Sequence, residues 1–192
     1  MPFILASSSP QRIKLLHQVK RKPFKIVNPN IDETIFPNEG PKDLCCRLAL
    51  LKAKDIHSKY SKDFILAADT VVSSGKRVLE KTNCKNQAQV FLNFLSGKRH
   101  RVYGGIALVG PNIVRVRSVT TQVSFKRLSK EEIRRYLDTE EWKNKAGAYA
   151  IQGLASKFIK RINGSYTNVV GLCVYTVESV LGGIKEIKNV DN

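Results

Sequence analysis

Apolar runs alternate with amphipathic stretches along the chain, which is the pattern of an α/β protein. Strands are predicted at residues 3–6, 24–27, 64–68, 77–80, 102–109, 113–124 and 158–162. Asp69 and Thr70 end the third of these runs, and Val71 and Val72 resume it. Helices are predicted at residues 10–19, 43–60, 86–95, 129–138 and 175–181. We therefore expect one α/β domain over residues 1–192, built on a mixed sheet, with a frayed tail from about Gly182.

Two of the predicted helices begin with clear capping signals. Ser9 is a good N-cap and Pro10 suits the first helical position, whereas Ser129 and Glu132 have the spacing of a capping box. The first of these helices follows a strand and a polar turn, a layout that points backbone NH groups at an anion. On this pattern alone, an ordinary capped helix is the interpretation that we favour.

Composition narrows the class of protein. The 192 residues are 42% hydrophobic and 26% charged, which excludes a disordered chain. No apolar stretch approaches the roughly 20 residues of a membrane span, and no basic and apolar leader precedes the first strand. We expect a cytoplasmic protein that does not associate with a membrane.

Positive charge is in excess, with 33 basic against 16 acidic side chains and a formal net charge of +17. The excess is spread over both halves of the chain, and no basic tail or arm stands out. We therefore do not expect nucleic acid as a partner, although a positive surface steers any polyanion, nucleotides included.

The cysteines and histidines form no recognisable metal site. Cys45, Cys46, Cys84 and Cys173 make neither a C-x-x-C pair nor a zinc spacing with the histidines. We expect free, buried thiols, as in a reducing compartment. His100 lies near a predicted loop and has no orienting acid beside it in the sequence, so we do not expect it to be catalytic.

Several catalytic signatures are missing from the sequence, namely H-E-x-x-H, G-x-S-x-G, the P-loop and G-x-G-x-x-G. What remains is a set of carboxylates, Glu33 and Asp69, together with the cations Arg12, Lys52 and Lys81. Asp69 is the most conspicuous, because a carboxylate at the end of an apolar strand is costly unless it has a function. Hard oxygen ligands favour Mg2+ or Mn2+, and cations favour phosphate. Together they indicate metal-assisted attack of water on a phosphoanhydride.

A series of motifs, in order and spacing, resembles the Maf family. They are ILASSSPQR at 4–12, IDET at 31–34, RLA at 47–49 with Lys52 and Ala53, AADTVV at 67–72, LSGK at 95–98 with His100, KAGAYAIQG at 145–153, and the stretch 162–172. The resemblance implies a cytoplasmic nucleoside triphosphate pyrophosphatase that uses a divalent metal, Mg2+ or Mn2+, and forms a homodimer. It also implies a fold like that of the inosine triphosphate pyrophosphatases: an elongated mixed sheet, flanking helices and a deep cleft between two lobes.

The resemblance also implies roles for individual residues. Asp69 matches the family's general base, with Glu33, Lys52 and Lys81 as the other catalytic cleft residues and with Glu33 and Asp69 as metal ligands. The substrate-binding residues that it implies are Ser7, Ser9, Gln11, Arg12, Thr70 and Gln152. Which of Glu33 and Asp69 takes the proton stays open.

Thr70 and Gln152 match the branch that acts on dTTP and UTP. Gln11, however, stands where that branch has an arginine, and an amide cannot hold a phosphate or carbonyl as a guanidinium does. Further departures are Glu80 for glycine, Thr82 for proline and Gly104 for threonine. The alternatives are the branch that acts on 7-methyl-GTP and a non-enzymatic factor that binds nucleic acid or the division machinery.

Overall fold

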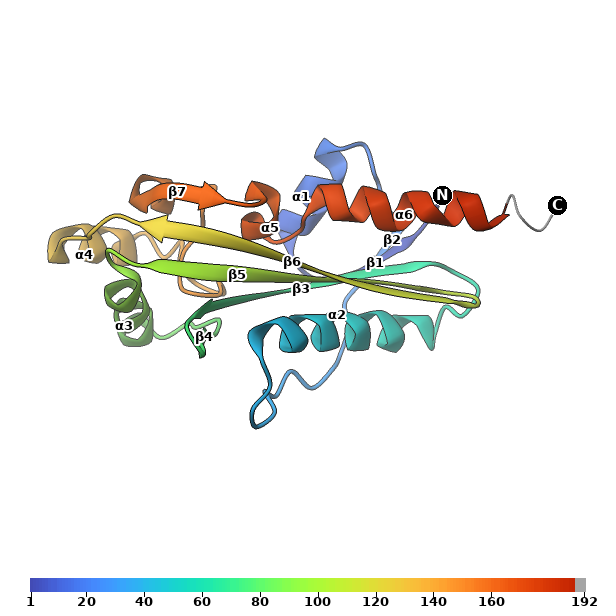
Figure 1. The fold of residues 1–192 in the computed structure, drawn as a ribbon, viewed down its shortest axis with the longest axis horizontal. Coiled ribbons are helices and arrows are strands. Elements are labelled where there is room, and N and C mark those ends of the chain that lie inside the picture. Colours follow the sequence, from blue (N-terminus) through green and yellow to red (C-terminus); the bar gives the residue numbers. More distant parts are fainter. Residues whose placement is uncertain (189–192) are drawn as a thin grey trace.

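The computed structural model describes residues 1–188, with side chains to Gly182, and shows a seven-stranded mixed sheet with helices on both faces (Figure 1). The strands, in chain order, are β1 Ile4–Ala6, β2 Lys25–Val27, β3 Ile65–Ser74, β4 Arg77–Leu79, β5 Arg99–Gly110, β6 Ile113–Phe125 and β7 Ile159–Asn163. The sheet order is β2-β1-β3-β5-β6-β7, and β4 pairs separately with β3. This confirms the α/β fold class with an elongated mixed sheet.

Strand direction changes at β3. β2, β1 and β3 run parallel to one another, whereas β3, β5, β6 and β7 are successively antiparallel. β5 and β6 form a long hairpin whose turn includes Asn112 in the left-handed region, at φ 62°. The long strands therefore make the frame on which the shorter parallel strands and the loops are mounted.

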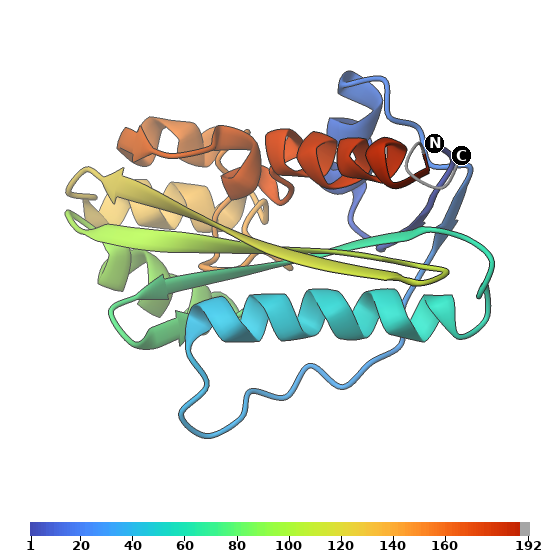
Figure 2. The same cartoon turned by 45° about the vertical axis from the view of Figure 1, so that its right-hand side comes forward.

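The helices are α1 Pro10–Gln18, α2 Pro41–His57, α3 Lys85–Leu95, α4 Lys130–Asp138, α5 Tyr166–Val170 and α6 Val174–Lys188, with a short 3-10 helix at Leu154–Phe158. α2 covers one face of the sheet, and α1, α5 and α6 lie on the opposite face (Figures 1 and 2). α3 and α4 lie together at the far end of the hairpin from its turn. Within the described residues, no helix is long and apolar enough to cross a membrane.

Alternating side chains of β3 serve two different cores, because successive residues of a strand point to opposite faces. Ile65 and Ala67 pack with Ala49 and Ala53 of α2. Leu66 and Ala68 pack on the other face, against residues of α1 and α6. The same alternation carries past Ala68 and determines where the polar residues Asp69 and Thr70 point.

Most of the predicted elements are confirmed, including the capping box of α4, in which Ser129 and Glu132 bond reciprocally. Three details were wrong. Asp69 does not end its strand, because the pairing with β5 continues from Ile65 to Ser73. Ser9 takes the N-cap position before Pro10, as predicted, but its side chain makes no cap hydrogen bond. α6 continues through the expected tail to Lys188, and residues 189–192 lie outside the described part of the chain.

The cysteines and His100 also differ from expectation. Cys45 and Cys173 are buried, but Cys46 is half-buried and Cys84 is exposed just before α3. His100 is not in a loop: it lies within β5 and is buried. Both differences arise because tertiary packing, which local sequence does not report, covers or uncovers these side chains.

Candidate active site

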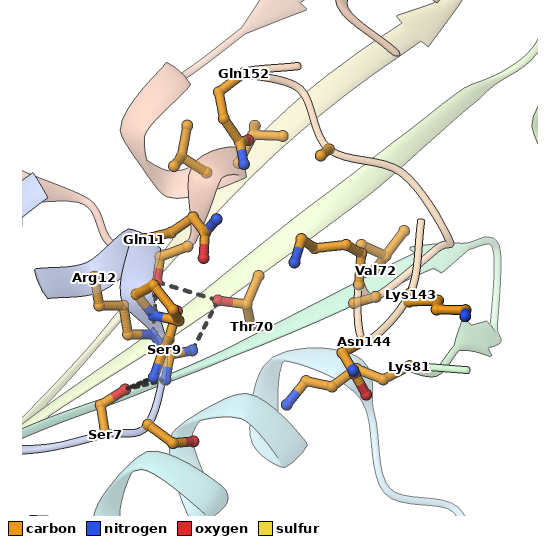
Figure 3. A pocket seen from close by; sticks show the side chains of 18 of the residues that line it. Ser7, Ser9, Gln11, Arg12, Thr70, Val72, Lys81, Lys143, Asn144 and Gln152 are labelled. Carbon is orange, nitrogen blue, oxygen red and sulfur yellow. Dashed lines mark hydrogen bonds between the residues drawn. The ribbon is translucent and has the colours of Figure 1, made fainter. Parts of the chain in front are cut away.

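A cavity of about 590 Å³ opens between the β1–α1 loop and the segment 143–152, in the place of the expected cleft (Figure 3). Nine of the predicted site residues line it: Ser7, Ser9, Gln11, Arg12, Glu33, Lys52, Thr70, Lys81 and Gln152. Asp69 lines a second cavity of about 280 Å³, which shares Glu33, Thr70 and Lys81 with the first. The structure therefore brings all ten predicted residues to two adjoining cavities.

Asp69 and Thr70 reach different partners because they are neighbours on one strand. Asp69 points to the α2 face with Ile65 and Ala67, and Thr70 points to the α1 face. Gly105 pairs with Asp69, and a Cβ at Gly105 would lie 2.1 Å from the Cys45 carbonyl oxygen. Glycine at that position lets α2 approach the sheet closely enough for Lys52 to meet Asp69.

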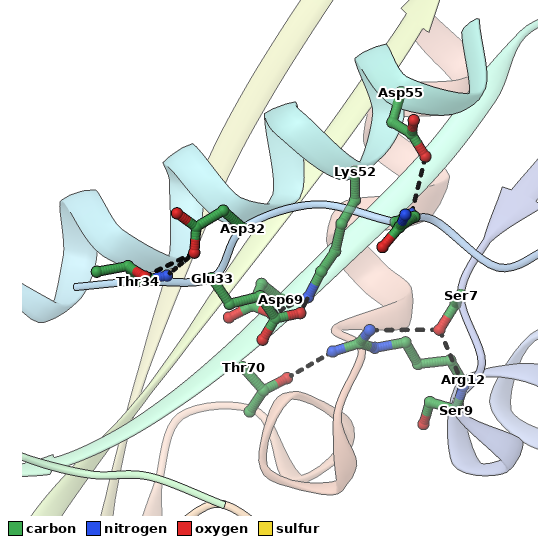
Figure 4. A network of polar contacts seen from close by, with 11 residues as sticks. Ser7, Ser9, Arg12, Asp32, Glu33, Thr34, Lys52, Asp55, Asp69 and Thr70 are labelled. Carbon is green, nitrogen blue, oxygen red and sulfur yellow. Dashed lines mark hydrogen bonds and ion pairs between the residues drawn. The ribbon is translucent and has the colours of Figure 1, made fainter.

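Lys52 joins the two acidic residues of the site (Figure 4). Its Nζ lies 2.6 Å from Asp69 Oδ1 and 2.7 Å from Glu33 Oε1. Lys52 and Asp69 are almost fully buried, whereas the Glu33 side chain is 47% exposed. Partial burial raises the pKa of Glu33, but the hydrogen bond and charge of Lys52 outweigh it, so that the net pKa is lowered. Glu33 is therefore held in its charged form.

Arg12 ties three segments together on the other side of β3. Its Nε donates to the Gly171 carbonyl at 3.0 Å, Nη1 to Ser7 Oγ at 3.3 Å and Nη2 to Thr70 Oγ1 at 3.2 Å. Burial lowers the pKa of Arg12, and the charges of Asp69 and Glu33 oppose that effect. Arg12 thus positions the cavity wall in addition to offering positive charge to a ligand.

The β1–α1 loop is organised by the Ser7 side chain and not by a cap hydrogen bond from the Ser9 side chain. Ser7 is buried, and its Oγ accepts a hydrogen bond from the Ser9 backbone N–H at 3.1 Å. Ser9 and Gln11 both line the cavity. The loop therefore presents polar groups to a ligand at the start of α1.

Lys81 comes from the other side of the cavity. It forms an isolated antiparallel bridge with Ala146, and Gly147 N donates to the Leu79 carbonyl at 2.9 Å. Desolvation by the surrounding protein lowers the pKa of Lys81, and the charges of Asp69 and Glu33 oppose it. Gly147 has φ 71°, and a Cβ there would lie 2.9 Å from Val72 Cγ1, which accounts for glycine in this motif.

Sequence reasoning missed some of the residues that line the larger cavity, two of which are lysines that make its wall cationic. Lys143, Asn144 and Lys145 line the cavity, although only Lys145 belongs to a recognised motif. Lys143 forms an ion pair with Glu140 at 2.6 Å. The available signal was the basic stretch directly before Ala146, but such a stretch is more commonly a solvated surface.

Gly104, one of the departures from the family pattern, has a steric explanation. A Cβ at Gly104 would lie 2.0 Å from Asn168 Oδ1. Asn168 is buried, and its Nδ2 donates to the Val102 carbonyl and to Thr121 Oγ1, both at 3.1 Å. In this chain, the position taken by Asn168 therefore excludes a threonine at residue 104.

His100 supports the wall of the cavity without lining it. Its Nε2 lies 2.8 Å from Tyr149 Oη, and both rings pack edge-to-face with Phe125. Burial lowers the pKa of His100 to about 4. Tyr149 lies in the cavity wall, so His100 contributes through packing and this hydrogen bond.

The donor set fits a divalent metal that arrives with a phosphate ligand. Glu33 and Asp69 offer two carboxylates that approach one another at Lys52, and Mg2+ is commonly bound by one or two carboxylates together with substrate phosphates. Among the described residues, no group of three or more histidine, cysteine, aspartate or glutamate side chains could form a complete metal cage.

Known proteins resemble this chain over nearly its whole length. A family model described as "Maf-like protein" matches residues 2–184. A dTTP/UTP pyrophosphatase of Chelativorans sp. (strain BNC1) is 47% identical over 186 residues, which are 93% of this chain and 89% of that protein. A nucleoside triphosphate pyrophosphatase of Ehrlichia ruminantium (strain Welgevonden) is 48% identical over 180 residues, 93% of this chain and 94% of its own.

Among solved structures, the Ham1 protein of Staphylococcus aureus aligns with 65% of this chain and 72% of its own, at 15% identity and a TM-score of 0.48. At that score the likeness supports no argument about activity. The match of residues 2–184 and the identities of 47% and 48% are decisive by themselves: the chain belongs to the family of Maf-like proteins.

Proposed function

We propose that this protein is a nucleoside triphosphate pyrophosphatase that takes dTTP and UTP and releases a nucleoside monophosphate and pyrophosphate. Curated relatives at 47% and 48% identity carry the names of such enzymes. The observation that carries the proposal is the pairing of Asp69 and Glu33 on the Lys52 ammonium, beside a cavity with a cationic wall. The cavity volume of about 590 Å³ lies in the range of small-ligand sites.

Asp69 is the residue best placed to accept a proton. Its Oδ1 is held by Lys52, while Oδ2 has no hydrogen-bond partner among the described residues, and Asp69 borders the smaller cavity. A water molecule in that cavity can give its proton to Asp69 as its oxygen bonds to the α-phosphorus. The bond from that phosphorus to the bridging oxygen breaks, and pyrophosphate leaves with the electron pair.

The cations of the cavity match the charge of such a substrate. Lys81 and Arg12 face the triphosphate and the leaving pyrophosphate, where negative charge accumulates. Lys52 keeps both carboxylates in place and offsets part of their charge. Gln11 and Gln152, whose amides line the cavity, are proposed to contact the nucleotide as the predicted substrate-binding residues.

A divalent cation, Mg2+ or Mn2+, would be held by Glu33 and Asp69. When bound, it supplies positive charge that polarises phosphate oxygens. We assign the proton to Asp69 and the larger share of metal binding to Glu33, because Glu33 is the more exposed of the two. The cytoplasmic location and the homodimer stay predictions.

A substrate panel tests the proposal. The purified protein is incubated with dTTP, UTP, the other common triphosphates and 7-methyl-GTP, with Mg2+ or Mn2+, and the products are separated. We expect monophosphate and pyrophosphate in equal amounts, with dTTP and UTP preferred. Nucleoside diphosphate with inorganic phosphate, or no hydrolysis at all, would overturn it. Preference for 7-methyl-GTP would favour the other branch, and salt-sensitive nucleic-acid binding without hydrolysis would favour a binding factor.

A further inference from the structure

The segment 28–40, which carries Glu33, is held almost entirely by side chains. It connects β2 to α2 without a helix or strand, and it swings away from the sheet beneath α2 (Figure 2). Over residues 28–39 the described backbone makes one backbone–backbone hydrogen bond, from Glu39 N to the Phe36 carbonyl. The place of Glu33 therefore depends on what fastens this segment to α2.

Ile31 and Ile35 of the segment pack against the apolar cluster that includes Leu44 and Leu48 of α2. Three further residues of α2 make polar contacts with the segment. Asp55 Oδ2 accepts from Asn30 N at 2.9 Å, Lys52 pairs with Glu33, and Arg47 binds the part of the segment that follows Glu33. Lys52 offers a single ammonium, which it shares with Asp69, and it cannot orient the Glu33 backbone. A cation that binds Asp69 or Glu33 would compete with this ammonium for the carboxylate.

Arg47 makes the most extensive of these contacts. Its Nη2 donates to the carbonyl of Thr34, the residue after Glu33, at 2.8 Å. Its Nε and Nη2 also bond Glu39 Oε1 and Oε2, at 2.6 Å and 2.7 Å, and its guanidinium stacks at 4.0 Å from the Phe36 ring centroid. One planar group thus fixes three points within six residues, which is the geometry for which arginine is suited and lysine is not.

We propose that Arg47 is a positioning residue for Glu33: it holds the segment 28–40 on α2 so that Glu33 stays beside Lys52 and Asp69. The kinetic part of this inference rests on the role given to Glu33 in the proposed function. Its structural part, the anchoring of the segment, does not. Arg47 itself does not line either cavity, so it acts through the segment.

Proteolysis tests the structural part without using activity. Segment 28–40 contains no lysine or arginine, but a glutamate-specific protease can cut after Glu33. Arg47→Lys keeps the charge and loses the planar fork, so we expect cleavage after Glu33 to be about tenfold faster than in the wild type. Arg21→Lys is the matched control, because Arg21 makes the same two-bond contact with Glu178, at 2.7 Å and 2.6 Å, away from the segment.

Kinetics test the connection to Glu33. We expect Arg47→Lys to lower kcat/KM by roughly tenfold or more and to raise the half-saturating Mg2+ concentration, whereas Arg21→Lys changes neither. In a Glu33→Gln background the Arg47→Lys effect should vanish, because both changes remove the same contribution. Glu39→Gln, which removes one of Arg47's partners, should shift each measurement in the same direction by less.

Two results would overturn the inference: unchanged cleavage of the segment in Arg47→Lys, or effects of Arg47→Lys and Glu33→Gln that simply multiply. Failure of the proposed function looks different. In that case no triphosphate is hydrolysed by the wild type, while the cleavage rates after Glu33 still decide whether Arg47 anchors the segment.

Discussion

Asp69 and Glu33 both pair with the ammonium of Lys52, but different structural features hold the two carboxylates in place. Asp69 lies in the middle of β3, within an uninterrupted ladder from Ile65 to Ser73 against β5, and its side chain is 4% exposed. Glu33 lies on a segment without regular structure, and its side chain is 47% exposed. Asp69 is positioned by its own strand, whereas Glu33 is positioned by side chains of α2 that contact its segment, among them Lys52 and Asp55 (Figure 4).

The difference has a consequence for what each carboxylate can do. A ladder of backbone hydrogen bonds does not depend on any one side chain, so Asp69 keeps its position when neighbours change. The segment that carries Glu33 can move when one or two polar contacts are lost, and such low-stability regions are common at ligand sites. We therefore assign the fixed chemical step to Asp69 and the adjustable contact with metal to Glu33.

The largest expected effect is that of Asp69→Asn. This change removes the proton acceptor and keeps the side-chain shape, so kcat should fall by about 10³-fold, within the usual range for a general base. Pyrophosphate release from dTTP or UTP measures it. Asp138→Asn is the control, since Asp138 is a half-exposed partner of Lys85 away from both cavities. Equal turnover by Asp69→Asn and the wild type would remove Asp69 from the mechanism.

Glu33→Gln should have a smaller effect of a different kind. Losing one metal ligand should raise the half-saturating Mg2+ concentration by roughly 10- to 100-fold, with a smaller loss of kcat at saturating metal. A Mg2+ titration at fixed substrate measures this. The comparison between the two carboxylates would be wrong if Glu33→Gln lowered kcat as far as Asp69→Asn and left the metal requirement unchanged.

The smallest expected effect concerns the free energy of unfolding. It comes from His100 in β5, the strand that pairs with the strand of Asp69. Burial lowers the pKa of His100 to about 4, whereas an unfolded histidine titrates near 6.5. As the pH falls, the unfolded state therefore binds a proton at this histidine before the folded state does. The free energy of unfolding keeps the full contribution of neutral His100 above about pH 6.5 and loses it as the pH falls toward 4. Between pH 7 and pH 5 this amounts to about 2 kcal/mol.

Urea unfolding at pH 7 and pH 5 measures that effect, with His100→Asn compared with the wild type. The variant should be less sensitive to the change of pH by about 2 kcal/mol. His17→Asn is the control, since His17 is exposed on α1. The same pH sensitivity in His100→Asn as in the wild type would show that another group is responsible.

Local sequence was a good guide to the elements and to the types of residue in the site. The capping box at Ser129 and the apolar run that became β3 were both recognisable, because each depends on neighbours within a few residues. The candidate set of ten residues came largely from the resemblance to the Maf family, and the structure gathers all of them at the two cavities. Lys143 and Asn144 were missed, since nothing local distinguishes them from surface residues.

Other features could not be predicted from local sequence. His100 and Cys84 were misjudged because their burial depends on elements far away in the chain. The continuation of β3 through Asp69 depends on β5, which supplies Gly105 opposite it. Arg47 drew attention only as part of a motif, and its contacts with Thr34, Phe36 and Glu39 are visible only once α2 and the preceding segment are placed together.

By itself, the sequence determined the alternation of strands and helices, the positive charge, and the identity of the carboxylates and cations. Periodicity and residue chemistry are local properties, so they can be recognised from the sequence alone. Only the tertiary structure decided that Asp69 and Glu33 share the ammonium of Lys52 while Thr70, one residue along β3, faces Arg12. The reason is that the two faces of one strand meet different helices, and which helix covers which face is set by the packing of the whole chain.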